Sequence, residues 1–337
     1  IYQKNNNLKY LFAILKLLPP ELSHLLALNG LKLMHKFGLI NFYKKDFNNK
    51  GSFTIANMSF NNKLGIAAGL DKNGDFIDSL GALGFGFIEV GTTTPLAQLG
   101  NPKPRIFRAF DENAIINRLG FNNKGVDHLV KRLKSRNYKG VVGVNIGANK
   151  NSKGEKRIAD YVECYKKVYD LSDYITINIS SPNTPDLRDL HNEANINQLL
   201  SSIKKEKEAL RSQKPIFLKI SPDETKDTIE IILKAVKKYE ITGLVLTNTT
   251  IDKTNLRNEA LKSEAGGLSG KPLFAKSTET IKVIKSLDNT IPVIGVGGVI
   301  DHSDYIAKFE AGADLVQIYT GFILKGPSIV SELLIQE

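Results

Sequence analysis

The stretch "NISSPNTPDLRDL", residues 178–190, contains residue types that could do chemistry. A short apolar run ends there in asparagine, two serines and two prolines, which is typical of a strand that opens into a shaped loop. Ser181 has no histidine beside it and lies in no Gly-x-Ser-x-Gly motif. His191 follows only beyond a charged loop, so a Ser–His pair is not indicated. The Ser181 hydroxyl therefore needs a role other than that of an activated nucleophile.

Asparagine and lysine are the other candidates for contacts with a ligand. Each asparagine side chain offers both a donor and an acceptor, which suits the edges of a flat, amide-rich ring. The candidates are Asn117, Asn145, Asn178, Asn183 and Asn248. Lys72 and Lys219 add positive charge for a carboxylate or for negative charge that develops during a reaction. No HExxH, paired CxxC or carboxylate cluster is present, so we expect no metal site.

Three glycine clusters point to a phosphate. They are "GGLSG" at 266–270, "GVGG" at 295–298 and "YTG" at 319–321. Glycine lets the backbone approach a ligand closely, and N–H groups at a helix start bind anions. Each cluster alone is weak evidence, but their order near the end of the chain predicts a phosphorylated ligand.

Eight short apolar runs must position these residues. They are "LGIAA" from residue 64, "FIEV" from 87, "VVGVNI" from 141, "YITINI" from 174, "PIFLKI" from 215, "GLVL" from 243, "PVIGV" from 292 and "LVQIY" from 315. Runs of this kind, separated by amphipathic stretches, are typical of buried parallel strands. Eight such units over about 270 residues predict an α/β fold, a (β/α)8 TIM barrel. A doubly wound sheet would need a GxGxxG turn after the first strand, and this turn is absent.

In this barrel, the polar and glycine residues follow directly after the apolar runs. They include Gly69, Lys72, Thr92, Asn145, Asn178, Ser181, Lys219, Thr247, Asn248, Gly297, Gly298, Tyr319 and Thr320. Barrel geometry brings all the strand ends to one mouth, where active sites of this fold lie. The two long intervals, 91–123 and 247–273, are rich in polar and turn residues, so we expect binding loops or lids there.

The N-terminal segment predicts two short helices. The first spans about 8–18, and Pro19 and Pro20 end it and open the second, with Gly38 as a C-cap. The second carries apolar residues at helical spacing, namely Leu22, Leu25, Leu26, Leu33 and Phe37. Either this pair packs as an ordinary extension, or it is an amphipathic hairpin at a lipid interface, which we favour. We place the boundary between this hairpin, 1–42, and the barrel, 43–337.

Composition limits the alternatives. The chain has a formal charge of +11, but its lysines are scattered and no zinc-finger or RNP motif is present, so we expect no nucleic-acid partner. No apolar run reaches the roughly 20 residues of a membrane-spanning helix, and the apolar N-terminal segment lacks a signal-peptidase site. The single cysteine, Cys164, is interpreted as a structural thiol in a reducing compartment.

Taken together, the motifs closely resemble those of the dihydroorotate dehydrogenases, from Lys63 to the C-terminus. They are "AAGLDKNG", "EVGTTTP", "NPKPRIFR", "INRLGFNN", "NIG", "NISSPNTP", "TNTT", "GGLSGKPL", "IGVGG" and "QIYTGFILKGP". Ser181 and the N-terminal hairpin resemble the membrane-associated, quinone-using class, since the soluble class has cysteine at this position.

This resemblance implies a barrel that binds FMN at its mouth. The enzyme would oxidise dihydroorotate to orotate in pyrimidine biosynthesis and pass the electrons to a quinone. The implied FMN contacts are Ala68, Gly69, Lys72, Thr92, Asn145, Asn178, Lys219, Thr247, Gly270, Gly298, Tyr319 and Thr320. The implied orotate contacts are Lys72, Asn117, Arg118, Leu119, Gly120, Phe121, Asn178, Asn183, Asn248 and Thr249.

The resemblance also assigns roles to single residues. Ser181 would take a proton from the substrate and relay it onward, and Lys219 would stabilise charge on the reduced flavin. His24, Arg108 and Tyr319 would line the quinone site. It further implies peripheral attachment through the N-terminal helices to the cytoplasmic face of a bacterial inner membrane, or alternatively to the mitochondrial inner membrane. No obligate protein partner is inferred.

Three other interpretations stay open at this point. The first is the same chemistry in a soluble enzyme with another electron acceptor, in which the hairpin is only structural. The second is a phosphate-binding aldolase or isomerase barrel that uses Lys219 as a Schiff-base lysine. The third is a non-catalytic protein of lipid surfaces, which leaves the asparagines unexplained.

Overall fold

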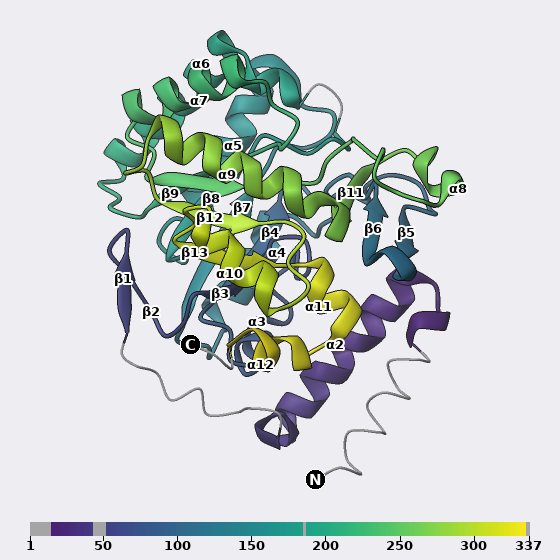
Figure 1. The fold of residues 1–337 in the computed structure, drawn as a ribbon. Helices are drawn as coiled ribbons and strands as arrows, with labels where there is room; N and C mark the ends of the chain where they lie inside the picture. Colours follow the sequence, from purple (N-terminus) through teal and green to yellow (C-terminus); the bar gives the residue numbers. More distant parts are fainter. Residues whose placement is uncertain (1–14, 43–51, 185–186, 335–337) are drawn as a thin grey trace.

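The eight apolar runs form a closed barrel of parallel strands in the computed structural model, which describes residues 15–42, 52–184 and 187–334 (Figure 1). Going around the barrel, the strands are β3 (Leu64–Ile66), β4 (Phe87–Thr93), β7 (Val141–Ile146), β8 (Tyr174–Asn178), β9 (Ile216–Ile220), β10 (Gly243–Leu246), β12 (Val293–Val296) and β13 (Leu315–Ile318). Every residue of these strands is buried. The predicted TIM barrel is confirmed.

Side chains fill the inside of the barrel in layers. A lower layer near the strand starts contains Phe87, Tyr174 and Phe217, whose rings meet edge to face. Above it, the buried Glu89 accepts hydrogen bonds from Thr176 Oγ1 at 3.1 Å and from Gln317 Nε2 at 2.8 Å, besides one from the Tyr174 hydroxyl. A buried carboxylate is tolerated only with such partners. The barrel is therefore solid below the mouth.

A hairpin of β1 (Phe53–Ile55) and β2 (Met58–Phe60) covers the N-terminal end of the barrel. Phe60 is fully buried, and its ring lies 5.6 Å from that of Phe87 at the start of β4. This hairpin was not predicted from the sequence. It closes the end of the barrel opposite the mouth.

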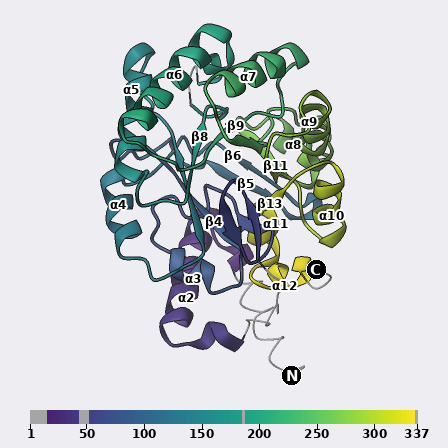
Figure 2. The same cartoon turned by 90° about the vertical axis from the view of Figure 1, so that its left-hand side faces the viewer.

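Amphipathic helices surround the strands (Figure 2). They are α3 (Ile77–Gly81), α4 (Val126–Lys134), α5 (Gly154–Val168), α6 (Glu193–Ala209), α7 (Lys226–Lys238), α9 (Phe274–Leu287), α10 (His302–Glu310), α11 (Thr320–Lys325) and α12 (Ser328–Leu334). Helix α7 is representative, because the Thr225 side chain caps its start and Ile229, Ile232 and Val236 face the barrel. Cys164 is buried in α5, where burial raises the pKa of its thiol, in agreement with a structural role.

A second, antiparallel sheet lies beside the mouth and was not predicted. It consists of β5 (Ile106–Ala109), β6 (Ala114–Asn117) and β11 (Gly267–Gly270), which come from the two long intervals. Short connections complete these intervals: η2 (Phe110–Glu112), α8 (Glu259–Lys262) and η4 (Lys271–Leu273). Segments 150 residues apart thus pair in register, for example Leu268 with Ile116.

The N-terminal extension is helical as predicted. Residues 15–17 are helical, and α2 (Pro20–Lys36) begins at the two prolines and ends before Gly38, whose φ is +71°. The rest of the first helix, residues 8–14, and the boundary at 42/43 lie at or outside the edge of the described residues. A short turn, η1 (Leu39–Phe42), follows α2. No helix among the described residues is long and apolar enough to span a membrane.

Helix α2 has two apolar faces. Leu28 and Leu31 are buried against the barrel domain, where α2 packs on α3 and β5. The other face is exposed and consists of Leu22, Leu25, Leu26, Leu33 and Phe37, each between 44% and 66% accessible. A contiguous exposed apolar surface on one helix indicates an interaction site rather than scattered surface residues.

Candidate functional site

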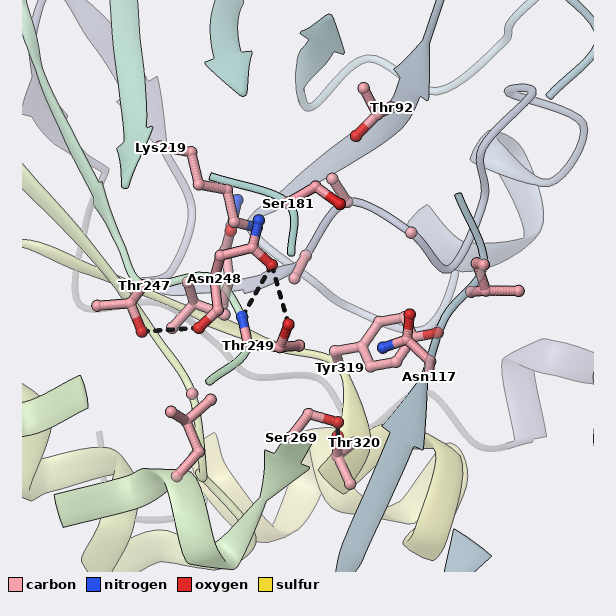
Figure 3. A pocket seen from close by; sticks show the side chains of 18 of the residues that line it. Thr92, Asn117, Ser181, Lys219, Thr247, Asn248, Thr249, Ser269, Tyr319 and Thr320 are labelled. Atoms are coloured by element: carbon pink, nitrogen blue, oxygen red, sulfur yellow. Dashed lines mark hydrogen bonds between the residues drawn. The ribbon is translucent and has the colours of Figure 1, made fainter. Parts of the chain in front are cut away.

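The strand ends enclose a polar pocket at the mouth of the barrel (Figure 3). It contains nearly all the residues that the sequence singled out: Ala68, Gly69, Lys72, Thr92, Asn117, Leu119, Gly120, Phe121, Asn178, Ser181, Asn183, Lys219, Thr247, Asn248, Thr249, Gly270, Gly298, Tyr319 and Thr320. They come from seven of the eight barrel strands and from the long loops. One cavity therefore gathers groups that are up to 250 residues apart in the chain.

Two of the expected contacts do not line this pocket. Asn145, on β7, is fully buried below it, where its side chain bonds Thr92 and Glu89. Arg118 points away, because its guanidinium pairs with Glu264 at 2.6 Å and lies over the Phe107 ring. The structure thus gives Asn145 a supporting position and Arg118 a position outside the cavity.

A chain of hydrogen bonds fixes the floor of the pocket. Asn145 donates to Glu89 at 2.8 Å and accepts from the Thr92 hydroxyl at 2.6 Å. Thr92 Oγ1 in turn accepts from Asn178 Nδ2 at 3.1 Å, and Asn178 Oδ1 accepts from Asn248 Nδ2 at 3.3 Å. Each amide side chain is thus held by a hydrogen-bond partner. Its rotamer and the direction of its remaining polar atoms are therefore fixed before a ligand binds.

Ser181 lies in the loop after β8 and is only 6% accessible. Its oxygen accepts a long bond of 3.3 Å from the backbone N–H of Asn183, as expected of a serine in a turn. The same side chain lines the pocket near Lys219 and Asn248 (Figure 3). The hydroxyl hydrogen has no acceptor among the described residues, so it is free to serve a ligand.

His191 is not a partner of Ser181. It is buried in η3 (Arg188–His191), and its Nδ1 lies 2.7 Å from Glu224 Oε1, although the angles do not meet hydrogen-bond geometry. It does not line the pocket. The structure thus holds His191 outside the pocket that Ser181 lines, and the two residues form no pair.

Two lysines are the only charged side chains that line the pocket within the described part of the chain. Lys219, on β9, forms no hydrogen bond or ion pair with a described residue, and burial lowers the pKa of its ammonium. Lys72 donates to Asn122 Oδ1 at 2.7 Å, and burial, with the charge of Arg105, lowers its pKa to about 7. Buried cations without counterions favour an anionic ligand.

Loops from the second sheet enclose the side of the pocket near Asn117. Asn183 donates to the Asn117 carbonyl at 3.1 Å, and Asn101 donates to the carbonyls of Arg118 and Asn183. The backbone of Phe121, with φ of +52°, turns its ring toward this space. These contacts hold Asn117 and Asn183 close to Ser181.

The opposite end of the pocket consists of glycine-rich backbone. A Cβ on Gly298, whose φ is +80°, would collide with the Phe274 backbone. A Cβ on Gly270, at φ of +95°, would collide with the Asn113 carbonyl. Thr320 starts α11 and donates to Ser269 Oγ at 2.8 Å. Only glycine fits at both positions, and backbone N–H groups in a glycine-rich wall of this kind suit a phosphate.

A second cavity of about 420 Å³ lies between α2 and the barrel. The three expected quinone-site residues, His24, Arg108 and Tyr319, all line it, and nearly all the other lining side chains are apolar. Arg108 donates to the Lys16 carbonyl at 3.0 Å and to the Leu18 carbonyl, which ties β5 to the start of the extension. Burial, followed by the charge of Lys72, lowers the pKa of His24 to about 4, so its ring is neutral at neutral pH.

Tyr319 lines both cavities. It follows β13, its ring lies 3.3 Å from the position of a Cβ on Gly69, and burial raises the pKa of its hydroxyl to about 12. The two cavities are therefore separated by a single neutral aromatic side chain at this point.

Several lining residues were not predicted. Ser269 lies in the "GGLSG" motif, and Gln317 is a polar residue inside an apolar strand, so both carried a signal that could have been used. Leu28, Leu31 and Met34 line the apolar cavity, but nothing distinguishes them from core residues in the sequence.

The chain matches known proteins over almost its whole length. A family model described as dihydroorotate dehydrogenase matches residues 52–337. A protein of Idiomarina loihiensis named dihydroorotate dehydrogenase (quinone) is 48% identical, over 94% of this chain and 95% of that protein. One of Saccharophagus degradans with the same name is 47% identical, over 94% of each.

Solved structures give the same result. A crystal structure of DHODH from Eimeria tenella in complex with ferulenol superposes with a TM-score of 0.85 at 34% identity, covering 94% of this chain and 90% of that one. The ligand-free form from the same organism gives 0.84 at 35% identity, with 92% of each chain covered. With the family model and the sequence relatives, these similarities show that the chain is an oxidoreductase and belongs to the dihydroorotate dehydrogenase family.

Proposed function

We propose that this chain oxidises dihydroorotate to orotate with FMN as the hydride acceptor, and that a quinone takes up the electrons. This reaction would serve pyrimidine biosynthesis. The observation that carries the proposal is the position of Tyr319, where a polar cavity suited to a flavin and an acid meets an apolar cavity suited to a quinone. Relatives at 44–48% identity carry the name dihydroorotate dehydrogenase (quinone), which supports the choice of substrate and acceptor.

The residues present fit FMN in three respects. The unpaired ammonium of Lys219 suits the electron-rich edge of a flavin ring, and the amides of Asn178 and Asn248 suit its polar edges. The backbone at Gly270 and Gly298 suits the phosphate, since a Cβ at either position would strike neighbouring backbone. FMN, when bound, would accept the hydride and release electrons to the quinone.

Ser181 is the residue that we assign to proton removal from the substrate. A serine hydroxyl has a pKa far above neutral, so it acts by standing against the proton and passing it on rather than as a free alkoxide. Water near Thr184, which is buried in the same loop, and near Phe121 would receive the proton. Asn117, Asn183, Asn248 and Lys72 would hold the ring and carboxylate of the substrate.

Lys219 is assigned an electrostatic role. Its ammonium is buried, and the carboxylate whose charge acts on it is Glu89, whose oxygens are already bonded to four other side chains. A preorganised cation in a dry site stabilises negative charge that develops next to it. A Schiff-base role in an aldolase or isomerase is disfavoured because the sequence relatives carry the name dihydroorotate dehydrogenase (quinone).

Attachment to a membrane follows from α2. Its exposed leucines and Phe37 would enter the lipid interface, with the apolar cavity opening beside them for a lipid-soluble quinone. We assign the protein to the cytoplasmic face of a bacterial inner membrane, with the mitochondrial inner membrane as the alternative.

The test is spectroscopic. Purified protein should be yellow, and its flavin absorbance should bleach when dihydroorotate is added without any acceptor. A short-chain quinone should then restore the colour faster than fumarate or NAD does. Colourless protein that binds no added FMN would overturn the cofactor assignment, and equal reoxidation by fumarate would overturn the acceptor.

A further inference from the structure

Lys308, on α10, is a buried lysine that the site described above does not use. Its side chain is fully inaccessible, and its Nζ donates to Ser277 Oγ at 2.6 Å and to Thr278 Oγ1 at 2.9 Å. The Nζ also lies 4.9 Å from the centre of the Phe274 ring. Two hydroxyls and a ring face are neutral partners. They orient an ammonium but do not balance its charge.

The charge balance around Lys308 is incomplete. Asp304, on the same helix, is the carboxylate whose charge acts on it, but Asp304 already pairs with Lys271 at 2.6 Å. Lys271 lies on η4, and its Nζ is 5.0 Å from the centre of the same Phe274 ring. Two lysines thus share one carboxylate. A buried charge without full compensation is costly, and burial lowers the pKa of Lys308 to about 7.

Lys308 lies directly behind the glycine-rich end of the polar cavity. Ser277, which accepts its hydrogen bond, has its Oγ 3.0 Å from the Gly297 carbonyl. Gly297 and Gly298 line the cavity, and Gly298 packs against the backbone of Phe274 at the start of α9. A single serine side chain therefore connects the ammonium to the wall of the cavity.

That end of the cavity has no lining cation among the described residues. The two lining lysines lie at the other end: Lys72 bonds Asn122, and Lys219 pairs in register with Asn178. Backbone N–H groups can hold a phosphate, but they do not neutralise a dianion. A positive charge close behind them would do so in a medium of low dielectric constant.

We propose that Lys308 supplies the countercharge for the phosphate of the bound flavin, and that Ser277 and Thr278 position it for this purpose, so that the cavity selects FMN over unphosphorylated riboflavin. The inference rests on the proposed function, because that function supplies a phosphorylated ligand. Lys308 touches neither substrate nor the reacting atoms, so it is a positioning residue.

The proposal requires that a phosphorylated ligand changes the protonation of Lys308. With no phosphate nearby, the ammonium of Lys308 loses its proton as the pH rises through its pKa of about 7. A phosphate dianion close by favours the charged form, so binding at pH 8 takes up a proton. Asp304 and Lys271 are the other charged groups at this place, and they are present with or without the ligand.

The experiment compares two ligands that differ only in the phosphate. FMN and riboflavin are titrated into the full chain freed of flavin, for the wild type and for Lys308→Met. The substitution should weaken FMN binding by about tenfold or more, which is about 1.4 kcal/mol, and should leave riboflavin binding nearly unchanged. Lys285→Met is the matched control. Lys285 lies on α9, but its Nζ donates to the Ile291 carbonyl at the end of the barrel opposite the mouth. The ratio of FMN affinity to riboflavin affinity in this variant should equal that of the wild type.

Proton uptake gives a second readout. Calorimetric titration of FMN at pH 8 in two buffers of different ionisation enthalpy should show uptake in the wild type and much less in Lys308→Met. If Lys308→Met does not fold, Ser277→Ala removes one of the positioning bonds and should lower the FMN-to-riboflavin affinity ratio by a smaller factor.

The outcomes separate the two proposals. An affinity ratio and a proton uptake that are the same in the wild type and in the variants would overturn the role of Lys308 alone. Wild-type protein that binds neither flavin would overturn the proposed function as well.

Discussion

The polar cavity at the barrel mouth is enclosed by the ends of strands, whereas the apolar cavity beside it is enclosed by one added helix and the outer surface of the barrel. In the first, amides and hydroxyls bond one another from Glu89 to Asn248. In the second, His24 and Arg108 are isolated polar groups among leucines and aromatic rings. Tyr319 belongs to both.

The difference concerns how each cavity selects a ligand. Hydrogen bonds are directional, and a buried polar group that loses its partner costs free energy, so the polar cavity should distinguish ligands by single atoms. Burial of apolar area is not directional, so the apolar cavity should accept many quinones that fit its volume. Removing a single polar atom should therefore weaken binding or reaction in the polar cavity, whereas binding in the apolar cavity should respond to changes of its volume.

The largest effect is expected from Ser181→Ala. The loss of a positioned proton acceptor typically costs about 10² to 10⁴ in rate. Reduction of the flavin by dihydroorotate, followed in a stopped-flow instrument, should slow by a factor in this range, while flavin content and reoxidation by quinone stay the same.

Ser172→Ala is the control for removing a buried hydroxyl. Ser172 is as buried as Ser181, but its hydroxyl donates to the Val168 carbonyl far from the mouth. Its flavin reduction should match that of the wild type. An unchanged rate in Ser181→Ala would remove this residue from the mechanism.

The next effect concerns pH. The pKa of Lys72 is lowered to about 7, so its ammonium loses its proton as pH rises through 7. A bound carboxylate favours the charged form, so the affinity for orotate should fall by up to about tenfold for each pH unit above 7. Orotate titrations of the flavin spectrum from pH 6 to 9 measure this slope.

Lys72→Met tests the assignment. It should bind orotate weakly with little dependence on pH above 7, because the titrating group is gone. A wild-type affinity that stays constant up to pH 9 would show that Lys72 does not meet the carboxylate.

Gly30→Leu addresses the apolar cavity. Gly30 lines it, and a Cβ there meets no atom within 4 Å, so a side chain at this position starts in open space and would occupy part of the cavity. We expect the KM for quinone to rise by about tenfold, with the rate of flavin reduction by dihydroorotate unchanged. Gly30→Ala is the matched control, since it gains about 1 kcal/mol of helix propensity but fills little volume. An unchanged KM for quinone in Gly30→Leu would place the acceptor elsewhere.

The two cavities also differ in how far the sequence predicts them. Lys219 and Thr247 could be assigned to one mouth because Lys219 is near the end of an apolar run and Thr247 directly follows another, and barrel geometry brings the strand ends together. Arg118 could not be assigned correctly by position, because its direction depends on Glu264, a residue of the other long loop. The local pattern determines which residues reach the rim, but not which way a loop side chain turns.

The second sheet and the apolar cavity show a stronger limit. The pairing of Gly267 with Asn117 joins segments from two separate loops, and such long-range register is not encoded in either segment alone. Leu28 on α2 faces the barrel while Leu25 faces outward, although both are apolar. A helix with apolar residues on two faces does not indicate from its pattern alone which of these faces it buries.

Glu21→Gln tests whether the two cavities are coupled, and we expect the smallest effect here. Glu21, on α2, accepts from Arg105 Nη2 at 2.7 Å and Nε at 3.0 Å. Arg105 also donates to the Asn101 carbonyl, and the Asn101 side chain donates to the Asn183 carbonyl. A continuous set of bonds therefore runs from α2, which forms one side of the apolar cavity, to the loop beside Ser181.

The substitution keeps an acceptor oxygen but removes the negative charge beside a nearly buried guanidinium, which costs about 1–2 kcal/mol. We expect a lower Tm by a few degrees, and a change of a few-fold both in orotate affinity and in the KM for quinone. Lys103→Met is the control, because Lys103 reaches the same carboxylate at 3.2 Å but is exposed, and exposed pairs contribute little. If Glu21→Gln alters only one of the two constants, the cavities are independent and α2 serves the quinone alone.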